Sequence, residues 1–153
     1  MTRTIAYCCL VVFVGVVCVA SLVSPDILSD RNLFLKNFVN HELLAILSVI
    51  VSITLASTSA LHLELNKIEE RRGRRGFQKT RAGIRQAAYF LILLLSLAVC
   101  LVFLKAGLNP PVPWQAFFNG MALFLLFWNV LILISITQAV FAIAPDIPDD
   151  DAS

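Results

Sequence analysis

The sequence predicts an all-α membrane protein whose four transmembrane helices form one bundle. The chain has 153 residues, of which 59% are hydrophobic, and its mean hydropathy is +0.85. Such a chain has too little polar surface to be a soluble globule. Four apolar segments, residues 5–24, 43–62, 87–104 and 117–142, contain no Asp, Glu, Lys or Arg. Each is long enough to cross roughly 30 Å of hydrocarbon as a helix.

The predicted spans, with their ends, cover about residues 5–24, 43–63, 87–105 and 116–142. Residues 1–153 form one domain, because too few residues remain outside the spans for a second folded unit. Cys18-Val19-Ala20 loosely fits a signal-peptide cleavage site, but the apolar run continues through Leu22 and Val23. We therefore expect the first span to be retained as a helix.

The distribution of charge predicts the orientation of the chain. Eight of the twelve basic residues lie in the loop 64–86, Arg3 precedes the first span, and Arg31, Lys36 and Lys105 lie on the other side. The positive-inside rule then places the loop and both termini in the cytoplasm. The chain has no N-x-S/T sequon, so nothing indicates a glycosylated eukaryotic route, and we expect the plasma (inner) membrane of a bacterium.

Residues 27–39 are expected to form a short helix in the outer membrane interface, with a plain loop as the alternative. The apolar residues lie close to one helical stripe and the charged residues lie elsewhere. Asn40 resembles an N-cap for the second span. The stripe consists of Leu28, Phe34, Leu35, Phe38 and Val39.

The second and third helices are expected to extend about two turns into the cytoplasm. The sequence beyond His62 is rich in helix formers and free of Pro and Gly up to Gly73. Gly73 and Gly76 favour a turn at the tip of a helical hairpin. Apolar residues on both arms are placed to pack together: Leu61, Leu65 and Ile68 on one arm, Phe77 and Ile84 on the other.

Two proline-containing segments bracket the fourth span. Prolines 110, 111 and 113 favour a stiff, extended hairpin before it. The acidic tail, residues 145–153, is expected to be disordered or docked on a basic surface.

Small and polar residues within the spans predict helix packing or oligomer contacts. Ser48, Ser52 and Ala56 have the small-xxx-small spacing that lets two helices approach closely. The hydroxyl-rich second span is alternatively a pore lining. Asn129 lies in mid-span, where an amide is costly unless it faces protein, and is the candidate for an inter-helical or inter-subunit hydrogen bond.

The sequence contains no pattern for a catalytic, cofactor or metal site. The four cysteines form no C-x-x-C pair, so a thiol oxidoreductase is disfavoured. His41 and His62 are 21 positions apart in one predicted helix, about 31 Å, which is too far for a shared metal within one subunit. No Asp, Glu, Lys or Arg lies within the four apolar segments, which disfavours a proton- or sodium-coupled transporter.

The basic loop supplies the candidate contact residues. Its cations favour anionic lipid headgroups or an acidic cytoplasmic protein partner. Nucleic acid is not expected, because no aromatic residues are interleaved for base stacking. The residues concerned are Arg71, Arg72, Arg74, Arg75, Lys79, Arg81 and Arg85.

The four-span plan is similar in size to several families whose motifs the chain lacks. The second span has no Arg-, Asn- and Glu-bearing motif of the membrane-associated glutathione and eicosanoid enzymes, and no span has the Glu of small multidrug exporters. The membrane component of the bacterial antiviral Kiwa system is similar in architecture only.

Three functions therefore stay open. The first is a non-enzymatic, oligomeric sensor or scaffold that recruits a cytoplasmic partner. The second is a pore-forming or holin-like channel or membrane effector, for instance of a bacterial antiviral system. The third is a membrane enzyme acting on a lipophilic substrate, which the missing catalytic constellation disfavours.

Overall fold

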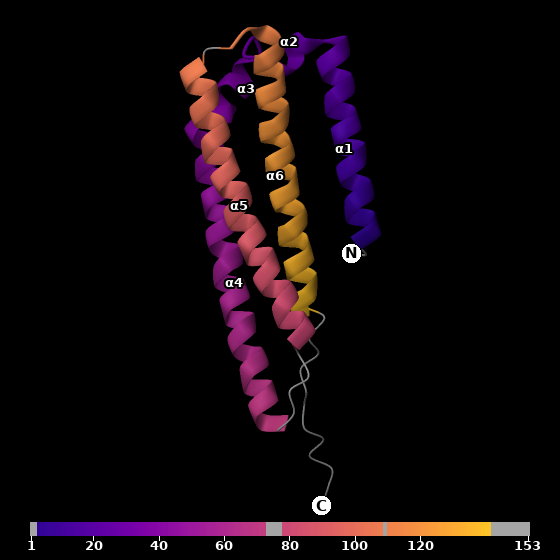
Figure 1. Ribbon diagram of the computed structural model, residues 1–153, viewed down its shortest axis with the longest axis vertical. Helices are drawn as coiled ribbons and strands as arrows, with labels where there is room; N and C mark the ends of the chain where they lie inside the picture. Colours follow the sequence, from indigo (N-terminus) through magenta and orange to yellow (C-terminus); the bar gives the residue numbers. More distant parts are fainter. Residues whose placement is uncertain (1–2, 73–77, 109, 142–153) are drawn as a thin grey trace, which may run out of the picture.

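The structure, a computed structural model, describes residues 3–72, 78–108 and 110–141, and no strand occurs in these ranges. Four helices are long and apolar enough to cross a membrane, as the sequence predicts. Figure 1 shows them running lengthwise, with the short helices at one end. The elements are α1 (Arg3–Val23), α2 (Pro25–Leu28), α3 (Leu33–Asn37), η1 (Phe38–Glu42), α4 (Leu43–Arg72), α5 (Gln78–Leu108) and α6 (Val112–Phe141).

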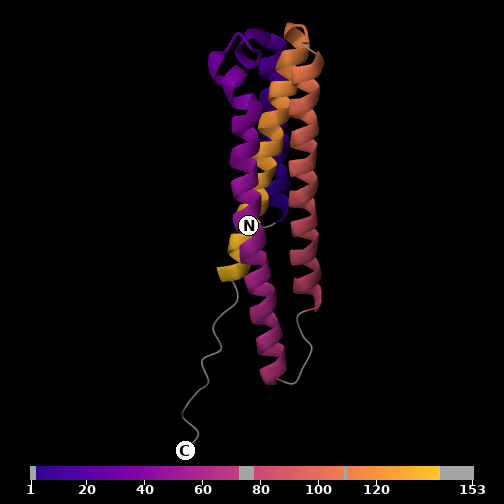
Figure 2. The ribbon, with the colours of Figure 1, turned by 90° about the vertical axis from the view of Figure 1, so that its left-hand side faces the viewer.

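Helices α4, α5 and α6 pack along one another (Figures 1 and 2). Their shared core contains Leu47 of α4, Leu94 and Ala98 of α5, and Leu125 of α6. On α4 the buried residues recur every three or four positions, which places them on one face. Helix α6 is buried on several sides, because it packs against α1, α2, α4 and α5. Within the candidate membrane spans many large apolar side chains are exposed, as expected of helices surrounded by hydrocarbon.

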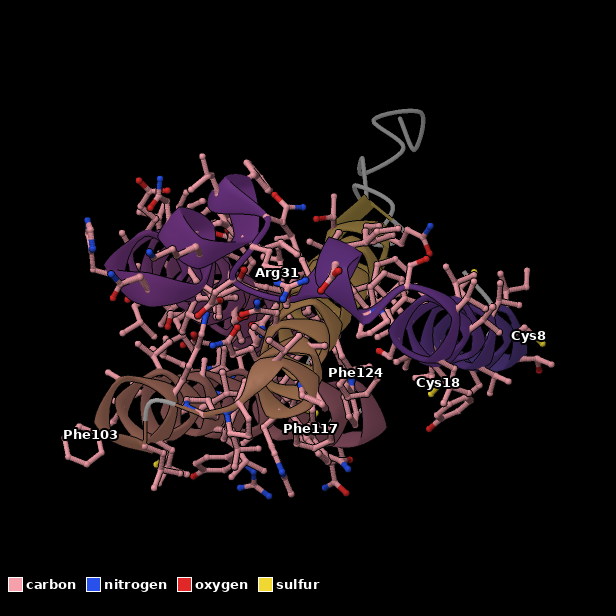
Figure 3. All side chains as sticks on the ribbon, turned by 90° about the horizontal axis from the view of Figure 1, so that it is seen from above. Cys8, Cys18, Arg31, Phe103, Phe117 and Phe124 are labelled. Atoms are coloured by element: carbon pink, nitrogen blue, oxygen red, sulfur yellow. The ribbon has the colours of Figure 1, made fainter. Side chains whose placement is uncertain are left out.

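Helix α1 lies against α6 rather than in the core (Figure 1). Phe13 stacks on Phe127 with ring centroids 4.5 Å apart. A Cβ atom on Gly120 would lie 2.8 Å from Val17 Cγ1, so glycine permits the close approach. No residue in the most apolar part of α1 is buried. Figure 3 accordingly shows Cys8 at the margin of the molecule.

The segment between α1 and α4 is helical but more broken than the sequence predicts. Pro25 begins α2, and the side chain of Asn32 caps α3 by accepting a hydrogen bond from Phe34 N at 3.1 Å. Asn40 has a non-helical backbone, φ −147° and ψ −142°, at the kink before α4.

The predicted apolar stripe of this segment is only partly buried. Leu28, Leu35 and Val39 belong to the core. Phe34 is instead 67% exposed and stacks on Phe38 with centroids 5.4 Å apart. Phe34 thus lies on the predicted stripe but outside the core.

The proline hairpin is shorter than expected. Helix α6 begins at Val112 and includes Pro113 in its first turn, where a missing N–H costs nothing because it would have no helical partner. The N–H groups of Trp114 and Gln115 both donate to the carbonyl of Pro111. The expectation of an extended chain through Pro113 was therefore wrong.

At the opposite end α4 and α5 form the stalk, which we define as residues 61–72 and 78–84. Helix α4 runs without a break to Arg72, and α5 begins at Gln78. Leu61, Leu65 and Ile84 form a buried cluster between the two arms. Three of the five residues predicted to pack there thus do so, while Phe77 lies outside the described residues.

Candidate functional site

The predicted basic contact residues lie at the stalk end of α4 and α5. Arg81 and Arg85 project from the first turns of α5, and Arg85 is exposed. Arg74, Arg75 and the acidic tail lie outside the described residues. The remaining basic residues are within helices, where the structure describes their backbone only: Arg71, Arg72 and Lys79.

Arg81 is engaged within the stalk. Its Nη2 donates to Glu69 Oε2 at 2.6 Å, and the two side chains are only 27% and 11% exposed. Arg81 Nε is buried without a hydrogen-bond partner. Because Glu69 offsets its charge, Arg81 fastens α5 to α4, and Arg85 is the basic residue of this turn that faces outward.

The predicted small-residue face of α4 is exposed. Ser48, Ser52 and Ala56 all lie outside the core. At 100° per residue they are rotated by roughly 100° to 180° from the centre of the buried stripe of α4, which contains Leu47 and Val51. This face is therefore open to a neighbouring helix.

Asn129 is fully buried within the packed helices. Its Nδ2 donates to the carbonyl of Leu125 on the same helix at 2.9 Å, and its Oδ1 has no hydrogen-bond partner. The amide thus lies in the core, away from any surface at which a second subunit would meet it, and the expected bond to another helix is not made.

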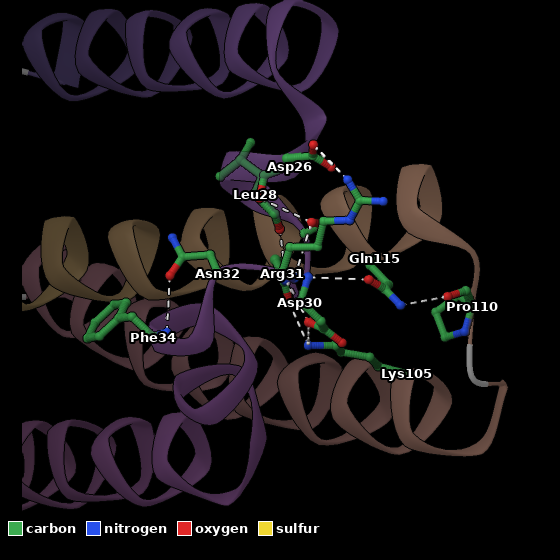
Figure 4. A network of polar contacts seen from close by, with 11 residues as sticks. Asp26, Leu28, Asp30, Arg31, Asn32, Phe34, Lys105, Pro110 and Gln115 are labelled. Atoms are coloured by element: carbon green, nitrogen blue, oxygen red, sulfur yellow. Dashed lines mark hydrogen bonds and ion pairs between the residues drawn. The ribbon is translucent and has the colours of Figure 1, made fainter.

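A polar cluster that the sequence analysis missed joins the helices at the end opposite the stalk (Figure 4). We call it the clasp and define it as Asp30, Lys105, Gln115 and Asn119. Lys105 Nζ lies 2.7 Å from Asp30 Oδ1 and donates to Asn119 Oδ1, also at 2.7 Å. Asn119 Nδ2 donates to the carbonyl of Leu28 at 2.8 Å and to Asp30 Oδ1 at 3.0 Å.

Gln115 completes the clasp. Its Oε1 accepts from the backbone N–H of Asp30 at 3.3 Å, and its Nε2 donates to the carbonyl of Pro110 at 2.9 Å. The turn before Asp30 is held by Ser29, whose Oγ donates to the carbonyl of Asp26 at 3.1 Å. The clasp therefore fixes the α2–α3 turn to the end of α5 and the start of α6.

Burial makes the clasp energetically important. Lys105 is 9% exposed and Asn119 is fully buried. A buried charge is tolerated only when it is paired and hydrogen-bonded, and both conditions are met here. By contrast the nearby Arg31–Asp26 pair is more than half exposed, so it contributes little.

One feature of the sequence could have indicated the clasp. Lys105 follows Leu94, Ala98 and Leu101 at spacings of four, three and four, so it continues the buried stripe of α5. The sequence analysis instead placed Lys105 at a membrane edge and counted its charge for topology. Asp30 is 75 positions away in the chain, and nothing local to Lys105 points to it.

Comparison with known proteins finds no family model, no curated protein and no solved structure that matches the chain. Within residues 3–72, 78–108 and 110–141 no three His, Cys, Asp or Glu side chains gather where they could hold a metal ion. The side chains of the clasp bond to one another and to nearby backbone groups, an arrangement that holds helices together.

Proposed function

We propose that this protein is a multi-pass protein of the bacterial plasma membrane that acts as an oligomeric sensor or scaffold. It recruits an acidic cytoplasmic partner through the basic hairpin that joins α4 to α5. The observation that carries this proposal is the continuity of α5. One helix of 31 residues, about 46 Å long, has Lys105 of the clasp at one end and Arg81 of the stalk at the other.

The two ends of α5 are both fastened to neighbouring elements. Lys105 is tied to Asp30 and Asn119, and Arg81 is tied to Glu69. A change that loosens the clasp would shift α5 as a rigid element and would move the stalk with it. This supports a sensor in which the outer end biases the cytoplasmic end.

The charge of the chain supports the proposed orientation and the chemistry of the partner. Nine basic residues belong to the loop 64–86 and the N-terminus, which we place on the same side of the membrane, against three on the side of the clasp. Arg81 is offset by Glu69, so we assign the contact with an acidic surface to the arginines nearest the loop. These are Arg71, Arg72, Arg74 and Arg75.

Changing these four arginines to Gln tests recruitment. Partner proteins bound to inside-out membrane vesicles from the native host are quantified for the wild type and the variant, with rising salt as a second axis. We expect the variant to lose the partner while its oligomer size is unchanged, and wild-type binding to weaken with salt. The control is the double variant Arg31→Gln with Lys36→Gln, which removes two cations from the clasp end. We expect this variant to bind the partner as the wild type does. Full binding by the quadruple variant would refute the docking proposal.

A pore is the second candidate, and the exposed hydroxyl face of α4 favours it. Ser48 and Ser52 face away from the packed helices, so an oligomer that turned these faces inward would line a channel with hydroxyls. Dye release from liposomes containing the purified protein discriminates between the two functions. A scaffold leaves the dye enclosed, whereas a pore releases it.

A further inference from the structure

A groove between α4 and α5 opens at the base of the stalk, outside the clasp. Its volume is about 680 Å³. It combines apolar walls with basic and polar side chains. The residues that define it are His62 and Leu63 of α4, with Arg81, Ile84, Arg85 and Ala88 of α5.

The groove lies at the depth of lipid headgroups. A span of about 20 residues crosses the hydrocarbon. Counting 20 positions from Lys105, at the clasp end of α5, reaches Arg85. Counting 20 positions from Leu43, at the start of α4, reaches Leu63, the neighbour of His62. Two helices counted independently thus bring the basic side of the groove to the same membrane interface.

The charge left over in the groove is positive. Arg81 is offset by Glu69 at 2.6 Å. Arg85 is exposed and makes no ion pair within the described part of the chain. His62 is exposed beside it, and an imidazole retains an N–H donor even when neutral. The groove therefore offers one uncompensated cation and a second donor to an anion.

The hydroxyl groups of the groove are not available to that anion. Thr58 Oγ1 donates to the carbonyl of Thr54 at 2.6 Å, and Ser59 Oγ donates to the carbonyl of Leu55 at 2.9 Å. Towards the middle of the span from Arg85, the groove is lined by the half-buried Ala88 of α5 and by Thr58 and Ser59 of α4, while the buried Ile84 lines it on the stalk side. A second hollow on the other side of Arg85 is lined by Tyr89, Phe90 and Leu93. Apolar side chains thus lie next to the uncompensated cation, on the side towards the middle of the span.

We propose that the groove binds one anionic phospholipid, with its phosphodiester between Arg85 and His62 and its acyl chains against the apolar walls. Basic pockets between membrane helices on the cytoplasmic side suit such lipids. The inference deepens the proposed function, since it rests on the membrane insertion and orientation proposed above. It gives the base of the stalk a fixed lipid partner, which is separate from the protein partner proposed for the hairpin tip.

Native mass spectrometry of the purified, delipidated protein tests the site. Phosphatidylglycerol and phosphatidylcholine with the same acyl chains are titrated in parallel. We expect phosphatidylglycerol to bind more tightly, and Arg85→Gln to weaken that binding roughly five-fold, as about 1 kcal/mol per cation near the surface corresponds to. Arg85→Lys, which keeps the charge, should retain most of the preference. Lys67→Gln is the matched control, because it removes one exposed cation from the same end outside the groove.

Two results would overturn the site. Equal weakening by Arg85→Gln and Lys67→Gln would mean that only the general basic field attracts the lipid. Displacement of the bound lipid by free glycerol phosphate at comparable concentration would mean that the walls bind no acyl chain. Ala88→Phe, which fills an apolar wall and leaves the cations in place, should also weaken binding. No cytoplasmic partner is present in these measurements. A negative result for the lipid site therefore does not refute recruitment, and a negative result for recruitment does not refute the lipid site.

Discussion

Lys105 Nζ lies 2.7 Å from Asp30 Oδ1, although 75 positions separate the two residues in the chain. This ion pair joins the turn after α2 to the end of α5, and Asn119 ties both residues to α6. It is the one place in the described chain where a side-chain network joins three such distant segments, so the position of α5 depends on it.

Lys105→Met should destabilise the protein by about 3–5 kcal/mol, because it leaves the carboxylate of Asp30 without its cation in a largely buried site. The double variant Lys105→Met with Asp30→Leu should lose less, since no unpaired charge remains. Unfolding in mixed micelles at increasing denaturant measures both. A single variant as stable as the wild type would show that the clasp holds nothing together.

Glu69→Gln should open the stalk locally, because Arg81 would lose its charged partner while its Nε is already buried and unpaired. Hydrogen exchange should then rise in residues 61–72 and 78–84 and stay unchanged at the clasp. Glu64→Gln is the control: its pair with Lys67 is about 60% exposed on both sides, and such pairs contribute at most about 1 kcal/mol. Equal exchange in both variants would remove the structural role of Arg81.

Ser52→Leu should break up the oligomer, because it adds bulk to the exposed small-residue face of α4 where close approach is proposed. Ala56→Leu should do the same. Ser96→Leu makes the identical change at an exposed position of α5 and should leave the assembly intact. Native mass spectrometry in detergent reads the subunit number. A monomeric wild type, or an unaltered oligomer in both α4 variants, would contradict the proposed interface.

The spans and the stalk were predictable from the sequence because each depends on a local pattern. Charge-free length alone indicates a span. The spacing of Leu61, Leu65 and Ile84 already placed them on facing stripes, and the structure buries all three. The prediction from helical periodicity was less accurate where the chain changes direction between α1 and α4. The single helix expected over residues 27–39 is interrupted by the turn between α2 and α3 and by the kink at Asn40.

The clasp could not be predicted from the sequence, for a different reason. Lys105 was visible as a charge in phase with the buried stripe of α5, but its partner Asp30 comes from the turn that follows α2. Which segment folds over the end of α5 depends on tertiary packing, and charge and spacing along the chain do not determine it. Lys105 is therefore buried and bonded to neighbouring segments.

The orientation of the hairpin is the claim on which the proposed recruitment depends, and cysteine accessibility tests it most directly. The four native cysteines are replaced, and single cysteines are introduced by Arg75→Cys at the hairpin and Pro111→Cys near the clasp. A membrane-impermeant maleimide is then added to intact cells and, separately, to permeabilised cells. We predict labelling at position 111 in intact cells and at position 75 only after permeabilisation. Labelling of position 75 from outside, with position 111 protected, would place the basic hairpin outside the cytoplasm and contradict recruitment of a cytoplasmic partner.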